Sequence, residues 1–193
     1  MAAAKHALRR TMRQLRHSIP HDLAQVAAER AAVHLLARGE LADVDIIGLY
    51  SPIRDELSTA PLIEALAERG VALAFPRVVA GKGRLVFHRV TDLTHLVVSA
   101  FGIPEPDVSA PVVPVENIDA FVVPGLAFDR DGWRLGWGKG HYDQTLAECP
   151  NALRIGYCFD AQVLDAIPAE DHDLSMQIIA TETSAIKTGS WTP

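Results

Sequence analysis

Cysteine is scarce in this sequence, and long apolar runs are absent. The chain has two cysteines among 193 residues, Cys149 and Cys158. They form no CxxC pair and have none of the Cys/His spacings that build a zinc site. We therefore expect two free thiols in a reducing cytoplasm. No apolar run approaches the roughly 20 residues that cross a bilayer, which excludes a membrane-spanning protein.

Two common phosphate-binding motifs are also missing, although residues 121–146 read as a strand, a glycine-rich turn and a helix. A Walker A loop ends in Gly-Lys-Ser/Thr, but Gly140 follows Lys139, and Trp133 stands where the first glycine belongs. A Rossmann fingerprint needs glycine or alanine at position 141, which is His141. Neither of these nucleotide-binding motifs is present.

The composition is that of an ordinary globular protein. Apolar residues make up 49% of the chain and charged residues 22%, which suits one good-sized core. No internal repeat or low-complexity tract divides the sequence. We predict a single domain over residues 1–193.

Charge is unevenly distributed along the chain. Residues 1–19 contain no acid and five cations: Lys5, Arg9, Arg10, Arg13 and Arg16. Because the whole chain carries −6, the remainder carries −11 and would repel a nucleic-acid backbone. An apolar stripe at helical spacing, Leu8, Leu15 and Ile19, favours a basic helix face for anionic ligands. The alternatives are an organelle transit peptide and a merely solvated helix.

Hydrophobic periodicity indicates helices that alternate with strands. Two N-terminal helices are predicted, over residues 3–19 and about 21–38, with Pro20 near the start of the second and Gly39 closing it. A third helix is predicted to begin at its cap, Ser58, and to end at Gly70. Strands are predicted at 45–50, 71–75, 84–90, 119–123, 154–159 and 178–181.

This order predicts a three-layer α/β/α fold with a largely parallel sheet. In such sheets ligands bind beyond the carboxyl ends of strands, here in the loops after residues 45–50 and 119–123. A turn is expected at Gly81-Lys-Gly83. Four prolines keep the region 98–118 extended, so that it wraps the surface or lines a cleft.

The glycine-rich turn has the composition of an anion site. Gly136, Gly138 and Gly140 let the backbone approach a ligand and direct N–H groups at it. Arg134 and Lys139 add positive charge, and the helix predicted to follow adds its N-terminal dipole. From this chemistry alone, a polyphosphate site and an ordinary glycine-rich turn stay equally open.

Six separated motifs resemble one family. Residues 124–143, PGLAFDRDGWRLGWGKGHYD, are similar to the PGLAFD-x-x-G-x-RLG-x-G-x-G-[YFH]-YD block of the 5-formyltetrahydrofolate cyclo-ligases. The resemblance covers nearly the whole chain. The other motifs follow in the family's order: Lys5-x-x-x-Arg9, YSPIRDE at 50–56, FPRV at 75–78, FGIPEP at 101–106 and Ile167-Pro-x-x-x-x-Asp173.

The resemblance implies an enzyme that converts 5-formyltetrahydrofolate and MgATP into 5,10-methenyltetrahydrofolate, ADP and phosphate. It implies ATP, a reduced folate and Mg²⁺ as partners, without nucleic acid or membrane, and a monomer is favoured. Two alternatives are a folate-binding regulatory protein without turnover and an ATP-dependent enzyme for another N-formyl or pterin-like compound.

The resemblance also implies roles for residues. Arg134 and Lys139 are the implied catalytic cations, because a guanidinium grips phosphate oxygens bidentately and lysine supplies a mobile point charge. The implied folate contacts are Ser51, Glu56, Trp137, Gly138, Lys139, Gly140 and His141. The implied ATP contacts are Lys5, Arg9, Arg134, Leu135, Gly136, Trp137, Gly138, Lys139, Gly140, His141 and Tyr142.

Asp143 and Asp173 match the family's Mg²⁺ positions. Magnesium is often held by only one or two carboxylates together with substrate phosphates. Taken alone, Asp143 could instead be a first-turn helix carboxylate, and Asp173 a loop acid bonded to its own backbone.

The chain departs from the family pattern at His141, where tyrosine or phenylalanine is frequent, at Trp137, where some members carry arginine, and at Met176-Gln177. A packing role is favoured for His141 over acid–base catalysis. Arg77 could contact the glutamate tail or be structural. Candidates to stack on a flat ring are Trp133, Trp137 and Tyr142.

Overall fold

A central eight-stranded sheet organises the chain. The computed structural model describes residues 2–79, 81, 83–99, 102–170 and 173–188. Lys82 of the predicted turn and Phe101 of the 101–106 motif lie outside these residues. The parallel strands are, in spatial order, β12 (Ile178–Ala180), β10 (Leu153–Tyr157), β7 (Ala120–Val123), β1 (Ile46–Gly48) and β2 (Ala72–Val78).

Antiparallel strands complete the sheet at both edges. β13 (Ala185–Lys187) pairs with β12, while β3 (Leu85–Arg89) and β6 (Val112–Val113) follow β2. The predicted α/β fold with a largely parallel sheet is thereby confirmed. β3 was predicted as a strand, although not its antiparallel direction, whereas β6 and β13 were not predicted, because strands of two or three residues show no clear period.

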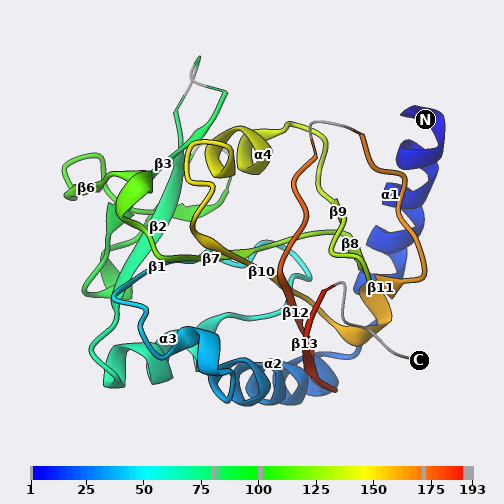
Figure 1. Ribbon diagram of the computed structural model, residues 1–193, viewed down its shortest axis with the longest axis horizontal. Helices are drawn as coiled ribbons and strands as arrows, with labels where there is room; N and C mark the ends of the chain where they lie inside the picture. Colours follow the sequence, from blue (N-terminus) through cyan, green and yellow to red (C-terminus); the bar gives the residue numbers. More distant parts are fainter. Residues whose placement is uncertain (1, 80, 82, 100–101, 171–172, 189–193) are drawn as a thin grey trace.

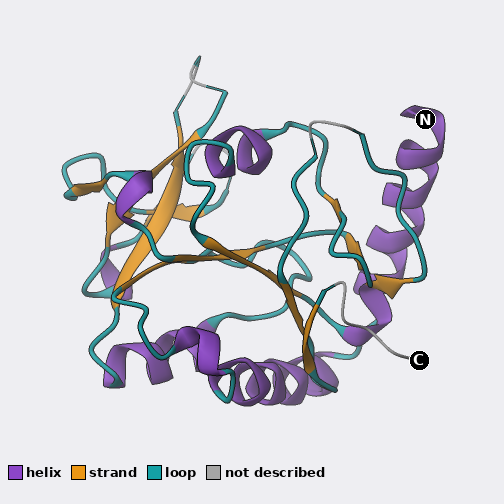
Figure 2. Ribbon diagram, in the orientation of Figure 1, coloured by secondary structure: helices purple, strands orange, loops and turns teal. Residues whose placement is uncertain are grey.

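Helices lie on both faces of this sheet (Figures 1 and 2). α2 (His21–Leu36) and α3 (Ala60–Glu68) cover one face. Small residues such as Ala28 and Ala31 let α2 pack closely in the larger apolar core. The other face carries the short helix α4 (His141–Leu146) over a second core cluster that includes Phe87 and Phe121. Both cysteines are buried and free, as predicted.

α1 (Ala2–His17) stands beside the main sheet and packs on a small three-stranded sheet (Figure 1). That sheet has the order β11 (Val163–Leu164), β8 (Ala127–Asp129), β9 (Arg134–Leu135). Leu8 and Leu15 pack in a cluster with Leu126 and Leu135, and Ile19 packs on the larger core. The apolar stripe therefore docks as predicted. Among the described residues, no helix has the length and apolar character to cross a membrane.

Some predicted boundaries are wrong by a few residues. α3 begins at Ala60 with Thr59 as N-cap, although the Ser58 hydroxyl accepts a hydrogen bond from the Ala60 N–H at 3.3 Å. Gly70 follows α3 with a φ of 78°, as a helix-ending glycine should. α2 ends before Gly39. Short 3₁₀ helices span Gly39–Leu41, Leu93–His95, Val115–Asn117 and Asp160–Gln162.

The described part of the proline-rich region is mainly extended. β5 (Pro104–Glu105) pairs with β4 (Val97–Val98), and β6 joins the main sheet. Because Ile103, Pro104 and Glu105 line a cavity, the prediction that this region lines a cleft is confirmed for these residues.

Candidate active site

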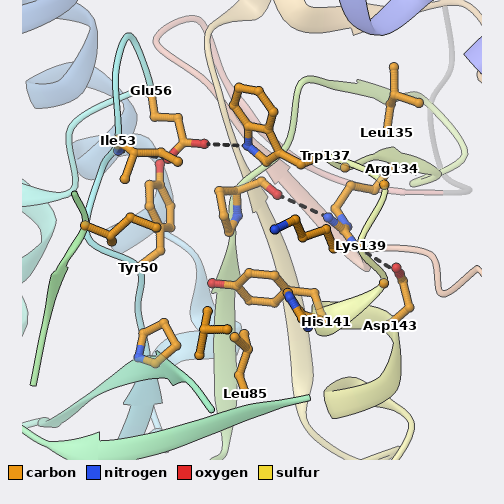
Figure 3. Close-up of a pocket in the computed structure, with 18 of the residues that line it drawn as sticks. Tyr50, Ile53, Glu56, Leu85, Arg134, Leu135, Trp137, Lys139, His141 and Asp143 are labelled. Carbon is orange, nitrogen blue, oxygen red and sulfur yellow. Dashed lines mark hydrogen bonds and ion pairs between the residues drawn. The ribbon is translucent and has the colours of Figure 1, made fainter. Parts of the chain in front are cut away.

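A cavity of about 770 Å³ lies beyond the carboxyl ends of β1 and β7, among the loops that follow them (Figure 3). α1, the loop after β1, the glycine loop after β9 and the segment around residue 170 all contribute to its wall. Every residue implied as a catalytic, ATP, folate or metal contact lines this cavity: Lys5, Arg9, Ser51, Glu56, residues 134–142, Asp143 and Asp173. The chain thus brings them together, while their individual roles stay predictions.

The glycine loop has a backbone that requires glycine. Gly138 and Gly140 have φ values of 92° and 69°, which other residues rarely adopt. A Cβ on Gly138 would also lie 3.2 Å from the Arg9 guanidinium. Arg9 Nε donates to the Gly136 carbonyl at 2.9 Å, which fixes α1 against the loop. The predicted helix follows as α4, which has six residues.

Arg134 and Asp143 form an ion pair in the cavity wall (Figure 3). Arg134 Nη2 lies 2.9 Å from Asp143 Oδ1, and the Arg134 side chain is only 7% exposed. Its Nη1 donates to the Pro124 carbonyl at 3.4 Å, and its guanidinium lies over the Tyr142 ring. Arg134 Nε is buried and has no hydrogen-bond partner among the described residues. Asp143 is in the first turn of α4 and also lines the cavity, while its role toward Mg²⁺ stays a prediction.

Lys5 pairs with the second predicted metal carboxylate. Its Nζ lies 2.8 Å from Asp173 Oδ2 and 3.2 Å from Glu170 Oε1. Burial opposes the charged form of Lys5, but the two carboxylates outweigh it and raise the pKa of the ammonium. Asp173 Oδ2 also accepts the Glu170 N–H at 2.8 Å, which is the local backbone bond predicted as the alternative.

The two carboxylates Asp143 and Asp173 could hold Mg²⁺ if a bound phosphate supplied further oxygen ligands. Asp143 and Asp173 supply hard carboxylate oxygens within one cavity. Among the residues that the structure describes, no three His, Cys, Asp or Glu side chains gather as a metal cluster. One or two carboxylates suffice when substrate phosphates supply further oxygens.

The opposite part of the wall is centred on Glu56, whose side chain is 4% exposed. Its Oε2 accepts the Ile53 N–H at 3.1 Å, and its Oε1 accepts the Trp137 indole N–H at 3.4 Å. Burial raises the pKa of Glu56, against the opposing effect of these donors and of Arg16. The buried Ser51 hydroxyl has no hydrogen-bond partner within the described ranges. This end of the cavity therefore offers hydrogen-bonding capacity to a ligand.

The remaining predicted residues divide between ligand and packing positions. Lys139 is exposed and reaches toward the middle of the cavity (Figure 3). His141 Nδ1 donates to the Gly83 carbonyl at 2.8 Å and ties α4 to the turn between β2 and β3, which supports the packing role. Trp133 packs in the α1 cluster and does not line the cavity, which favours a packing role over stacking on a ligand. Arg77 donates to the Pro106 carbonyl, which supports its structural role.

Several cavity residues were not singled out from the sequence. Arg54 is the clearest case: it has a φ of 53°, unusual for a residue other than glycine, and its guanidinium lies 5.0 Å from the centroid of the Trp137 ring. Arg54 belongs to the YSPIRDE motif at 50–56, and this membership could have identified it as a site residue. Val78 and Glu105 likewise lie within quoted motifs, at 75–78 and 101–106, whereas Leu85 and Glu170 had no distinguishing pattern.

Comparisons with known proteins agree with this geometry. Residues 1–182 match the model of the 5-formyltetrahydrofolate cyclo-ligase family. A 5-formyltetrahydrofolate cyclo-ligase of Mycolicibacterium smegmatis is 34% identical over 95% of this chain and 96% of its own, and that of Escherichia coli K12 is 28% identical over 88% and 96%. The NMR structure of Aquifex aeolicus 5,10-methenyltetrahydrofolate synthetase superposes with a TM-score of 0.83 at 28% identity and covers 98% of this chain and 95% of its own. The chain belongs to the 5-formyltetrahydrofolate cyclo-ligase family.

Proposed function

We propose that this protein converts 5-formyltetrahydrofolate into 5,10-methenyltetrahydrofolate and couples the cyclisation to cleavage of MgATP to ADP and phosphate. One observation carries the proposal. A single cavity joins a cationic wall of Lys5, Arg9, Arg134 and Lys139 to a wall where Ser51 and Glu56 retain hydrogen-bonding capacity. The family membership supports the same reaction.

The proposed reaction has two steps. The formyl oxygen of the folate attacks the γ-phosphorus of ATP, and ADP leaves. N10 then attacks the activated formyl carbon, a proton leaves N10, and the C–O bond breaks to release phosphate and close the ring. Because the activated intermediate is reactive, the site must also keep water away from it.

The cations act on the transferring group. Arg134 is nearly buried and fixed by Asp143 and by the Pro124 carbonyl, which suits it to grip phosphate oxygens in one geometry. Lys139 is exposed at the cavity wall, and its flexible side chain can follow the moving phosphoryl group. Mg²⁺, held by Asp143 and Asp173 together with phosphate oxygens, would neutralise charge that develops on the phosphates.

The folate contacts the opposite wall. Glu56 accepts hydrogen bonds from the amino group of the pterin, and the Trp137 indole, already oriented by Glu56, offers a flat surface to the ring. This arrangement sets the formyl group between the folate wall and the cations, and alignment of this kind lowers the barrier to transfer.

A substrate screen that follows ADP release tests the proposal. We expect ADP with 5-formyltetrahydrofolate and none with the 10-formyl isomer or with N-formylated amino acids. Binding of 5-formyltetrahydrofolate without ADP release would instead indicate a folate-binding protein without turnover. ADP release with a different N-formyl compound alone would assign the site to another substrate.

A further inference from the structure

Arg16 is a buried cation behind the folate wall. It lies in the last turn of α1, is 2% exposed and does not line the cavity. Its Nη1 is 3.6 Å from Glu56 Oε1 and donates to the Gly125 carbonyl at 3.4 Å. Its Nε has no hydrogen-bond partner among the described residues. A buried guanidinium is costly unless an opposite charge compensates it, and Glu56 supplies that charge.

Trp137 completes the arrangement around Glu56. The Arg16 guanidinium lies 5.7 Å from the centroid of the Trp137 ring, and the Arg54 guanidinium lies 5.0 Å from it. The same ring donates its N–H to Glu56 Oε1, while the Ile53 N–H holds Oε2. A carboxylate has about four lone-pair positions, so acceptor capacity remains on Glu56 for a ligand in the cavity.

We propose that Arg16 is a positioning residue that keeps Glu56 ionised and aimed at the donor groups of the folate. Folate affinity would then depend on a cation of α1 that touches neither substrate. The inference rests on the proposed function, because Glu56 must be the group that meets the folate.

Electrostatics support this assignment. Burial raises the pKa of Glu56, and the charge of Arg16 acts in the opposite direction. Among the described residues, Tyr50 and Tyr142 also interact with Glu56, and burial raises the pKa values of both so that they stay neutral. Arg54, in the same loop as Glu56, is exposed and lies over the Trp137 ring. Removing Arg16 should therefore raise the pKa of Glu56 further. Protonated Glu56 would lose acceptor capacity, so folate binding should weaken as pH falls.

The test compares Arg16→Met with wild type, with Arg16→Lys as the conservative variant and Arg10→Met, an exposed cation of the same helix, as control. We expect Arg16→Met to raise the KM and Kd for 5-formyltetrahydrofolate about tenfold or more, as when one partner of a buried charge pair is removed. The KM for ATP should stay within about twofold, since Arg16 lies outside the cavity. Arg16→Lys should restore part of the affinity, and Arg10→Met should match wild type.

Two further measurements exclude a merely structural effect. Between pH 7.5 and pH 6, the Kd should rise more steeply in Arg16→Met than in wild type. In a Glu56→Gln background, Arg16→Met should add almost no further loss. The inference would be overturned if the loss of folate affinity in the double variant equalled the product of the losses in the two single variants. It would also be overturned if folded Arg16→Met raised the KM for both substrates equally. Wild type that binds the folate without releasing ADP would contradict the proposed function and leave the Kd comparison intact.

Discussion

At the scale of single residues, two cations of the cavity are paired with the two expected metal carboxylates. Arg134 contacts Asp143 and Lys5 contacts Asp173, so each expected metal carboxylate faces an expected phosphate cation. We expect ATP to draw the cations toward its phosphates and leave the carboxylates to Mg²⁺. Mg²⁺ and ATP should therefore each bind more tightly in the presence of the other.

Asp143→Asn tests this exchange. The amide can still accept a hydrogen bond from Arg134, but it lacks the charge that Mg²⁺ needs. We expect kcat to fall by about 10²-fold or more, as when electrostatic stabilisation of a transition state is lost. The increase in ATP affinity on adding Mg²⁺, measured by titration calorimetry, should shrink. Asp131→Asn, an exposed acid of the β8–β9 hairpin, is the control. Unchanged turnover in a folded Asp143→Asn variant would leave Asp143 as a helix-start carboxylate.

Lys139→Met separates binding from transfer. If the ammonium meets the γ-phosphate chiefly as charge moves onto it, kcat and kcat/KM should fall together, because the contact is stronger in the transition state. Steady-state kinetics with ATP varied at saturating folate provide the measurement. A raised KM for ATP with kcat intact would reduce Lys139 to one more binding cation.

At the scale of elements, the longer helices and the buried strands were predicted from the sequence, whereas the shortest strands were not. α2 was expected because its alanine-rich sequence has a strong intrinsic helix propensity, and β7 because a fully apolar segment suits a strand buried on both faces. β8 and β9 were not expected. They have three and two residues, which is too short for a hydrophobic period to show. The pairing of Ala127 with Leu135 also depends on the turn between them, which hydrophobic periodicity does not predict.

Gly138→Ala tests the glycine loop as an element. Its φ of 92° is strained for alanine, and the new Cβ would press on Arg9. We expect a loss of about 1–2 kcal/mol in the free energy of unfolding and a higher KM for ATP. Gly39→Ala is the matched control, because its Cβ would meet nothing within 4 Å. Equal stability of the two variants would show that the loop tolerates other conformations.

At the scale of the whole molecule, contacts between distant segments make the site. Lys5 meets Asp173, Arg9 meets Gly136, and Glu56 meets Trp137. The motifs predicted which residues belong to the cavity, since motif residues follow β1 and β7 at the ligand-binding edge of the sheet. The pairings of Lys5 and Arg9 could not be predicted because they depend on where α1 docks, and that of Glu56 with Trp137 depends on how two loops distant in the sequence meet. Arg16 looked like its neighbouring cations in the sequence, and only burial distinguishes it.

The central claim is that one cavity couples ATP cleavage to folate cyclisation. The most direct measurement follows ADP and 5,10-methenyltetrahydrofolate together in one reaction of the wild-type protein. We predict one ADP for each methenyltetrahydrofolate formed, and no product when ATP is omitted or excess EDTA removes Mg²⁺. Product formation at an unchanged rate in excess EDTA, or ADP release without cyclised product, would contradict the account.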